Sequence, residues 1–140
     1  MLRSTSVKQE SWKPVKLLAK QPVKDKILAL ECDLEGKIAV ALTATSINIF
    51  NERELLNSID VNGGRQLKIS SNLECIFVLT SEKLFCFDYW GNIKWEYTSE
   101  GLIDDFIVNP TGKNIVLRGE KFMILLNRFG DLEWDHNVPE

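Results

Sequence analysis

The sequence is poor in the residues that build metal sites and many active sites. Its 140 residues contain one histidine, His136, and three cysteines that lie far apart, Cys32, Cys75 and Cys86. No Cys-x-x-C spacing is present, so neither a zinc site nor a disulfide framework is expected. We therefore expect no metal, no cofactor and no catalytic residues, and we interpret the cysteines as buried free thiols.

Long apolar runs are also missing. No run approaches the roughly 18–20 residues that a bilayer-spanning helix needs. The N-terminal stretch MLRSTSVKQESWKPVK has no continuous apolar core, so it does not resemble a secretory signal. We expect a soluble, cytoplasmic protein that forms one domain or a piece of a larger one.

Charge is distributed unevenly along the chain. Residues 1–26 hold seven Lys/Arg and two Asp/Glu, a net of +5, whereas residues 27–140 hold ten Lys/Arg and eighteen Asp/Glu, a net of −8. The N-terminal lysines are spaced out and separated by apolar residues. We interpret residues 1–26 as a basic extension with a solvated face, and we expect neither a membrane nor a nucleic acid as its partner.

The rest of the chain repeats itself about every 38 residues, with similar segments that begin at Ile27, Leu67 and Ile103. A leucine recurs in the second apolar run of each segment at intervals of 37 and 38 residues: Leu42, Leu79 and Leu117. A period of this length indicates a repeat architecture.

Each segment contains four short apolar runs separated by turn residues. In the third segment the runs are DFIV, NIVL, FMILL and DLEW, and the turns are NPTGK, RGEK and NRFG. Runs rich in Ile, Val, Leu and Phe fit a pleated sheet, and runs that are apolar throughout indicate burial on both faces. Four-stranded units of this length are typical of β-propeller blades. A β-sandwich or an irregular barrel is the alternative, although neither requires a sequence repeat.

We therefore predict an all-β chain that forms a propeller-type arc of about three four-stranded antiparallel blades. The expected blades are residues 27–64, 65–101 and 102–140, preceded by the extension of residues 1–26.

One short phrase occurs twice. DYWGNIKWEY, residues 88–97, and NRFGDLEWDH, residues 127–136, each place a tryptophan four residues after a glycine. With the Gly-Lys turn of NPTGK, these phrases resemble the repeat of PQQ-like and WD40-like propeller proteins common in archaea and bacteria. The resemblance covers residues 27–138. The first segment departs from it, because NERELLNS has neither the glycine nor the tryptophan.

The resemblance implies structural roles for four residues. Trp95 and Trp134 would dock between adjacent blades with the indole N–H on a backbone acceptor. Tryptophan buries a large area and keeps one polar group that needs a partner, which agrees with this role. Gly91 and Gly130 would permit a positive φ in the turn between the third and fourth strands. Enzymes of the quinoprotein type are longer and carry calcium ligands and a vicinal cysteine pair, which this sequence lacks.

Three aromatic residues are candidate contacts with a partner. Trp90 and Phe129 immediately precede the turn glycines, where polar residues are usual in the family, and we expect them to form part of a protein-binding ridge. Folding of both rings back onto their blades is the alternative. Trp12, within SWKPVKLLAKQPVK, is a candidate anchor for a clasp strand on a neighbouring blade, and a loose tail is the alternative.

Three blades are expected to leave an open arc, because closed propellers usually have 4–8 blades. The uncovered apolar faces invite association. We expect a non-catalytic scaffold for protein–protein interaction or assembly, with a protein partner or further copies of the chain closing the propeller. The alternative is a partial ligand-sensing or quinoprotein-like enzymatic propeller that further sequence or another subunit completes.

Overall fold

The computed structural model describes residue 23 and residues 25–139, and this part of the chain contains strands and no helix. The first blade consists of β1 (Ala29–Cys32), β2 (Ala39–Leu42), β3 (Ser46–Phe50) and β4 (Leu55–Asp60). The second consists of β5 (Gln66–Ile69), β6 (Ile76–Leu79), β7 (Lys83–Phe87) and β8 (Ile93–Thr98). The third consists of β9 (Asp105–Val108), β10 (Asn114–Arg118), β11 (Phe122–Asn127) and β12 (Leu132–Asn137).

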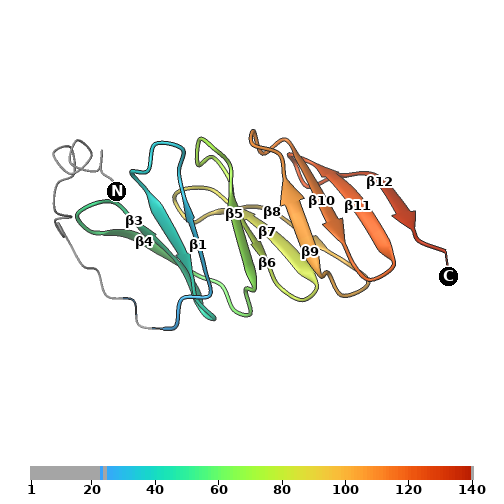
Figure 1. The fold of residues 1–140 in the computed structure, drawn as a ribbon, viewed down its shortest axis with the longest axis horizontal. Coiled ribbons are helices and arrows are strands. Elements are labelled where there is room, and N and C mark those ends of the chain that lie inside the picture. The colour runs from blue at the N-terminus through green and yellow to red at the C-terminus, as the bar shows by residue number, and fades with distance from the viewer. Residues whose placement is uncertain (1–22, 24, 140) are drawn as a thin grey trace, which may run out of the picture.

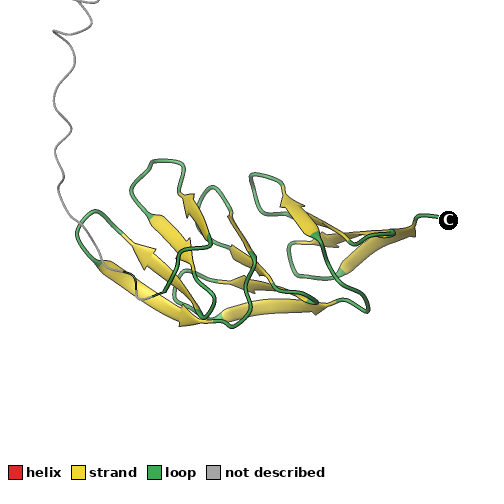
Figure 2. Ribbon diagram, turned by 60° about the horizontal axis from the view of Figure 1, so that its bottom comes forward, coloured by secondary structure: helices red, strands yellow, loops and turns green. Residues whose placement is uncertain are grey.

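Each blade is an antiparallel meander whose strands pair in chain order. The first strands of the blades lie nearest one another, since β1 contacts β5 and β5 contacts β9. The three sheets therefore follow one another along the molecule, as Figures 1 and 2 show. The predicted fold class, an all-β arc of three propeller-type blades, is confirmed. The described residues contain no helix that is long and apolar enough to cross a bilayer.

The core consists of two apolar layers, one in each space between neighbouring blades. Strand β6 lies between them and is buried along its whole length. Ile76 and Val78 belong to the layer shared with the first blade, and Phe77 and Leu79 to the layer shared with the third. Successive side chains of a strand point to opposite faces, so a blade with two neighbours needs an apolar residue at every position.

The predicted alignment of the third segment is wrong by one residue. Phe77 pairs with Cys86, which pairs with Trp95, and the matching residues of the third blade are Val116, Leu125 and Trp134. Two residues further along the second strand, Leu79 therefore corresponds to Arg118 and not to Leu117. Leu79 faces the third blade and Leu117 faces the second, because a shift of one residue turns a side chain to the opposite face.

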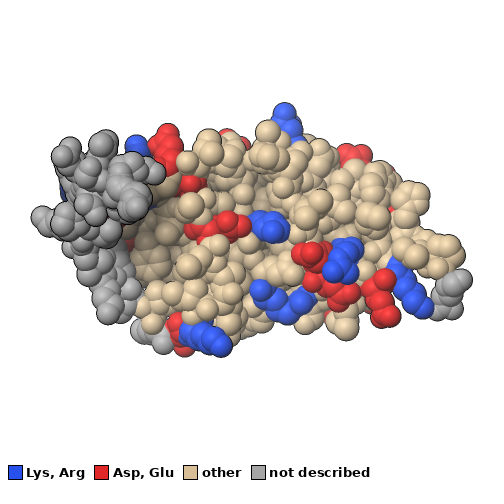
Figure 3. Space-filling model, in the orientation of Figure 1, with Lys and Arg blue, Asp and Glu red and all other residues tan. Residues whose placement is uncertain are grey.

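The basic extension lies almost wholly outside the described residues, as does Trp12. Near the end of the extension, the Asp25 carboxylate accepts a hydrogen bond of 2.7 Å from the Thr45 hydroxyl of the first blade. On the face of the molecule in Figure 3, basic and acidic side chains are interspersed over the blades and do not gather by sign.

Candidate functional site: a rim groove and an open blade face

Trp95 joins the second blade to the third. Its indole N–H donates a hydrogen bond of 2.8 Å to the backbone carbonyl of Arg128, in the turn between β11 and β12. A Cβ added to Gly130 would lie 2.6 Å from the Trp95 ring, and Gly130 has a φ of +81°. Glycine at position 130 therefore serves both the left-handed backbone and the close approach of the indole.

The two glycine turns are held by the side chains that begin them. The Asp88 carboxylate accepts backbone hydrogen bonds of 2.9 Å from Trp90 and 2.8 Å from Asn92. The Asn127 side-chain oxygen accepts the equivalent bonds from Phe129 at 2.9 Å and Asp131 at 3.0 Å. The hydrogen bonds from Asn92 and the turn backbone lower the pKa of Asp88, because they stabilise its charged form.

The turn of the first blade is shorter. In the first blade, the Asn51 N–H donates to the carbonyl of Glu54, three residues later. In the second blade, the Asp88 N–H donates to the carbonyl of Asn92, four residues later. The residue that the first blade lacks is the turn glycine. In its fourth strand, Asn57, which pairs with Ile49, occupies the position that holds a tryptophan in the later blades. The departure of the first segment from the motif is thus a one-residue deletion together with a replaced tryptophan.

Trp90 and Phe129 point away from the core. Their exposed fractions are 76% and 61%. The Trp90 ring meets Tyr89 edge to face with ring centroids 5.2 Å apart, and the Arg128 guanidinium lies 4.7 Å from the centre of the Phe129 ring. The two aromatic residues line neighbouring hollows rather than one groove, because the loop that contains Asn72 and Glu74 lies between them.

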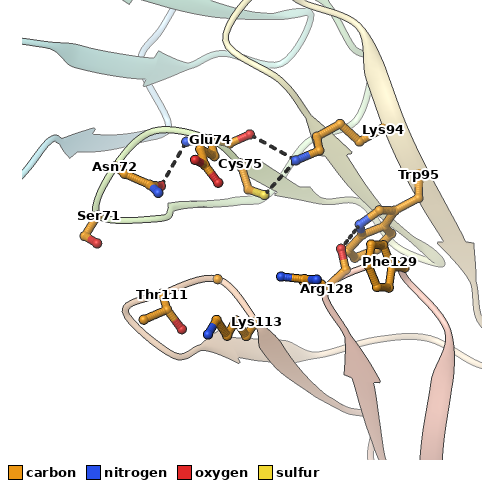
Figure 4. A pocket seen from close by; sticks show the side chains of 11 residues that line it. Ser71, Asn72, Glu74, Cys75, Lys94, Trp95, Thr111, Lys113, Arg128 and Phe129 are labelled. Atoms are coloured by element: carbon orange, nitrogen blue, oxygen red, sulfur yellow. Dashed lines mark hydrogen bonds between the residues drawn. The ribbon is translucent and has the colours of Figure 1, made fainter.

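The hollow beside Phe129, which we call the rim groove, has a volume of about 520 Å³ and lies between the second and third blades (Figure 4). The loops β5–β6, β9–β10 and β11–β12 form its walls together with the start of β8, so turns distant in sequence meet at one rim. Its lining residues are Ser71, Asn72, Glu74, Cys75, Lys94, Trp95, Thr111, Gly112, Lys113, Arg128 and Phe129.

Cys75 lies in the lining of the rim groove with 7% of its surface exposed. The Lys94 ammonium is 3.5 Å from its sulfur and 3.5 Å from the Glu74 carbonyl oxygen. The pKa of Cys75 is lowered to about 6, first by a hydrogen bond with Cys86 and then by the Lys94 charge, against the opposing effect of burial. The same interaction with Cys75, together with burial, raises the pKa of Cys86.

The expectation of buried thiols is confirmed for Cys75 and Cys86 and wrong for Cys32, which is exposed. Cys32 is the last residue of β1 and lies on the same face of the strand as Leu30, which is 65% exposed. Sequence reasoning missed the environment of Cys75, because its neighbours Lys94 and Cys86 come from other strands and only the strand register brings them together. Among the described residues, no group of three His, Cys, Asp or Glu could hold a metal ion.

A second surface, the open blade face, is the side of the third blade that turns away from the second. Ile107, Val116, Leu125 and Trp134 pair in a row across β9 to β12. In the second blade the same row consists of Lys68, Phe77, Cys86 and Trp95, and the third blade covers Phe77 and Cys86 completely.

The open blade face is apolar and accessible. The exposed fractions of Ile107, Met123 and Trp134 are 61%, 40% and 39%. A shallow hollow of about 260 Å³ lies beside Ile107 and Met123. The Trp134 ring lies 5.2 Å from the His136 ring, and no described residue accepts a hydrogen bond from its indole. Trp134 thus lacks the carbonyl acceptor that Trp95 has.

Solved structures share this arrangement of blades, whereas no protein-family model and no curated protein sequence matches the chain. BamB from Moraxella catarrhalis has a TM-score of 0.68 at 18% identity, over 82% of this chain and 38% of that one. Hsv2 from Kluyveromyces marxianus has a TM-score of 0.62 at 11% identity, over 81% of this chain and 40% of that one. Hsv2 from Kluyveromyces lactis has a TM-score of 0.60 at 13% identity, over 79% and 36%.

BamB and Hsv2 are both β-propeller proteins, and this chain spans about two fifths of the length of each. At such low identity the similarity concerns the fold alone. The strand order, the two apolar layers between the sheets and these comparisons agree: the chain has the fold of three consecutive blades of a β-propeller.

Proposed function

We propose that the chain is a non-catalytic scaffold that binds a protein partner through the open blade face. The uncovered row that ends in Trp134 supports this proposal most directly. The corresponding residues of the second blade are covered by a neighbouring blade, and exposed apolar surface of this kind favours association.

The partner surface that fits this face is a further β-sheet blade with a glycine in its third turn. Trp95 requires such a glycine, because any larger residue at position 130 would clash with the indole. A blade of the same kind would give the Trp134 indole a carbonyl acceptor and a glycine to pack against. Tryptophan buried in this way is a frequent centre of binding energy.

The chain's own first blade fits this role poorly. Its third turn, Asn51 to Glu54, has no glycine and is one residue shorter. A ring built from copies of this chain would therefore place Trp134 against a turn that has no glycine to make room for the indole. For this reason we favour a blade from a different polypeptide, or from sequence beyond these residues, over a homo-oligomeric ring.

The test places a photo-crosslinking amino acid at Met123 in the full chain, expressed in the cells that naturally produce it. Leu34, which is 85% exposed at the other end of the arc, is the matched control position. We expect an adduct from Met123 that is absent from Leu34. The purified partner should bind the full chain, and Trp134→Ala should weaken binding at least tenfold while Trp90→Ala should not.

Three results would contradict the proposal. They are identical adducts from both positions, a dissociation constant unchanged by Trp134→Ala, and an adduct between two copies of this chain. The last result would replace the heterologous partner with a homo-oligomer, which sedimentation of the purified chain would then show directly.

We also propose that the protein is cytoplasmic and that its repeat is of the archaeal and bacterial PQQ-like type. The three free cysteines support the first point, since reduced thiols are usual in the cytosol. The paired phrases GNIKW and GDLEW support the second. A fluorescent fusion of the full chain tests the location, and a signal confined to another compartment would contradict it.

A further inference from the structure

We propose that Cys75 is a site of reversible modification, at which it forms a mixed disulfide with a small anionic disulfide that binds in the rim groove. This inference does not depend on the proposed scaffold function. It concerns a different surface, between the second and third blades.

The surroundings of Cys75 favour a thiolate. The Lys94 ammonium lies 3.5 Å from its sulfur, and the interaction with the Cys86 thiol lowers the pKa of Cys75 further. Both contacts stabilise negative charge on Cys75 and bring its pKa to about 6, so the sulfur is ionised at neutral pH. Cys86 is fully buried and remains protonated, which makes Cys75 the nucleophile of the pair.

The rim groove gives a reagent access to this sulfur. Its volume of about 520 Å³ falls within the usual range for small-molecule pockets. Figure 4 shows Cys75 on one side of this space, with Trp95 and Phe129 on the other. The small exposed fraction of Cys75 is therefore turned toward a hollow that can admit one arm of a short peptide disulfide.

The charge of the rim groove favours an anion. Lys94, Lys113 and Arg128 line it against a single carboxylate, Glu74. No carboxylate of the described residues forms an ion pair with Lys113 or Arg128. Because residues 27–140 contain ten Lys/Arg and eighteen Asp/Glu, the rim groove is a basic spot on an acidic body. Such a spot raises the local concentration of anions.

The reaction is thiol–disulfide exchange and needs no further oxidant. The Cys75 thiolate attacks one sulfur of the disulfide, a new sulfur–sulfur bond forms, and the other half of the reagent leaves as a thiolate. Cys75 is oxidised and the leaving half is reduced. An excess of free thiol reverses the reaction. In the modified state, the adduct occupies the rim groove and the charge attraction between Cys75 and Lys94 is lost.

The test compares two reagents on the intact folded chain: oxidised glutathione, which is anionic, and cystamine, which is cationic. Mass spectrometry of peptides follows modification at Cys75 and at exposed Cys32, which serves as the internal reference. For each cysteine, the rate of modification by glutathione disulfide is divided by the rate of modification by cystamine. At neutral pH, this reagent ratio should be at least tenfold higher at Cys75 than at Cys32. The double variant Lys113→Met/Arg128→Met should reduce this ratio to that of Cys32.

A second measurement separates ionisation from binding. The rate at Cys75 should reach half its maximum near pH 6, and Lys94→Met should move this midpoint to higher pH. The same experiments in a Cys86→Ser background, which keeps a hydrogen-bond donor, prevent bridging between the two cysteines. Equal reagent ratios at both cysteines would overturn the proposal. So would a Cys75 that remains unmodified after Cys32 has fully reacted.

Discussion

At the scale of single residues, the contact between Trp95 and Gly130 shows how one missing side chain joins two blades. The indole occupies the space where a Cβ at position 130 would lie, and its N–H reaches the next blade's backbone. The sequence predicted glycine and tryptophan as a pair within one hairpin. In the structure, Trp95 packs against Gly130, the glycine of the following blade, and only the arrangement of the sheets reveals this pairing.

We expect Gly130→Ala to destabilise the protein more than Gly36→Ala. Both glycines have a positive φ, so each alanine bears a left-handed backbone cost of roughly 1–2 kcal/mol. Gly36 has open space around it, whereas an alanine at position 130 collides with Trp95 and should cost about 1–3 kcal/mol more. Urea unfolding of both variants measures the difference. Equal losses would show that the Trp95 contact contributes little.

The two exposed aromatic residues also allow a test at this scale. Because the structure leaves Trp90 and Phe129 largely exposed, changing both to alanine should alter the free energy of unfolding by less than about 1 kcal/mol. Thermal and urea unfolding would be measured beside partner capture. A loss of several kcal/mol would show that both rings pack on their blades, and would contradict a binding ridge.

At the scale of elements, the strands were easier to predict than their register. The four runs of each segment became strands because Ile, Val, Leu and Phe flank clear turn residues. The register of β10 was predicted wrongly because Leu117 and its neighbours are apolar on both faces, so the pattern did not distinguish one face from the other. Only the pairing of Trp134 with Leu125 fixes it.

The two glycine turns provide a matched comparison, since an aspartate begins one and an asparagine the other. The lowered pKa of Asp88 means that its charged form stabilises the folded state above the ordinary value of 3.8. This stabilisation is lost as the pH falls through the lower, folded-state pKa. Asp88→Asn, which copies Asn127, should therefore reduce the dependence of unfolding free energy on pH in the acid range.

The measurement is urea unfolding at several pH values from neutral to well below 3.8. Glu133→Gln, which removes an exposed carboxylate outside the turn, is the control and should leave the pH dependence near that of the natural protein. If Asp88→Asn and Glu133→Gln behave alike, the turn hydrogen bonds are not the cause.

At the scale of the whole molecule, the sequence predicted that the arc has uncovered faces but did not identify the residues that form them. The repeat indicated about three blades and thus uncovered faces. It did not show which face is apolar, because the register slip misplaced the residues of β10. The structure assigns the open blade face to Ile107, Met123 and Trp134, and separates it from the rim groove.

Ile107→Lys should change the open blade face without changing the fold. The second blade carries Lys68 at the same place in its row, so lysine is compatible with this strand. We expect the free energy of unfolding to change by less than about 0.5 kcal/mol, because Ile107 is 61% exposed. Binding of a hydrophobic fluorescent dye and self-association at high concentration should both fall. Unchanged dye binding would argue that this face is not the apolar surface.

The two separate apolar layers have a consequence for motion. Each blade packs only on its neighbours, so the stability of the chain is close to a sum of blade and interface contributions. Strand β6 contributes to both layers, whereas every residue of β12 is exposed. Amide hydrogen exchange should be slowest in β6 and fastest in β12, with the third blade opening while the first two remain folded. The partner proposed for the open blade face would then bind the part of the chain that opens most readily.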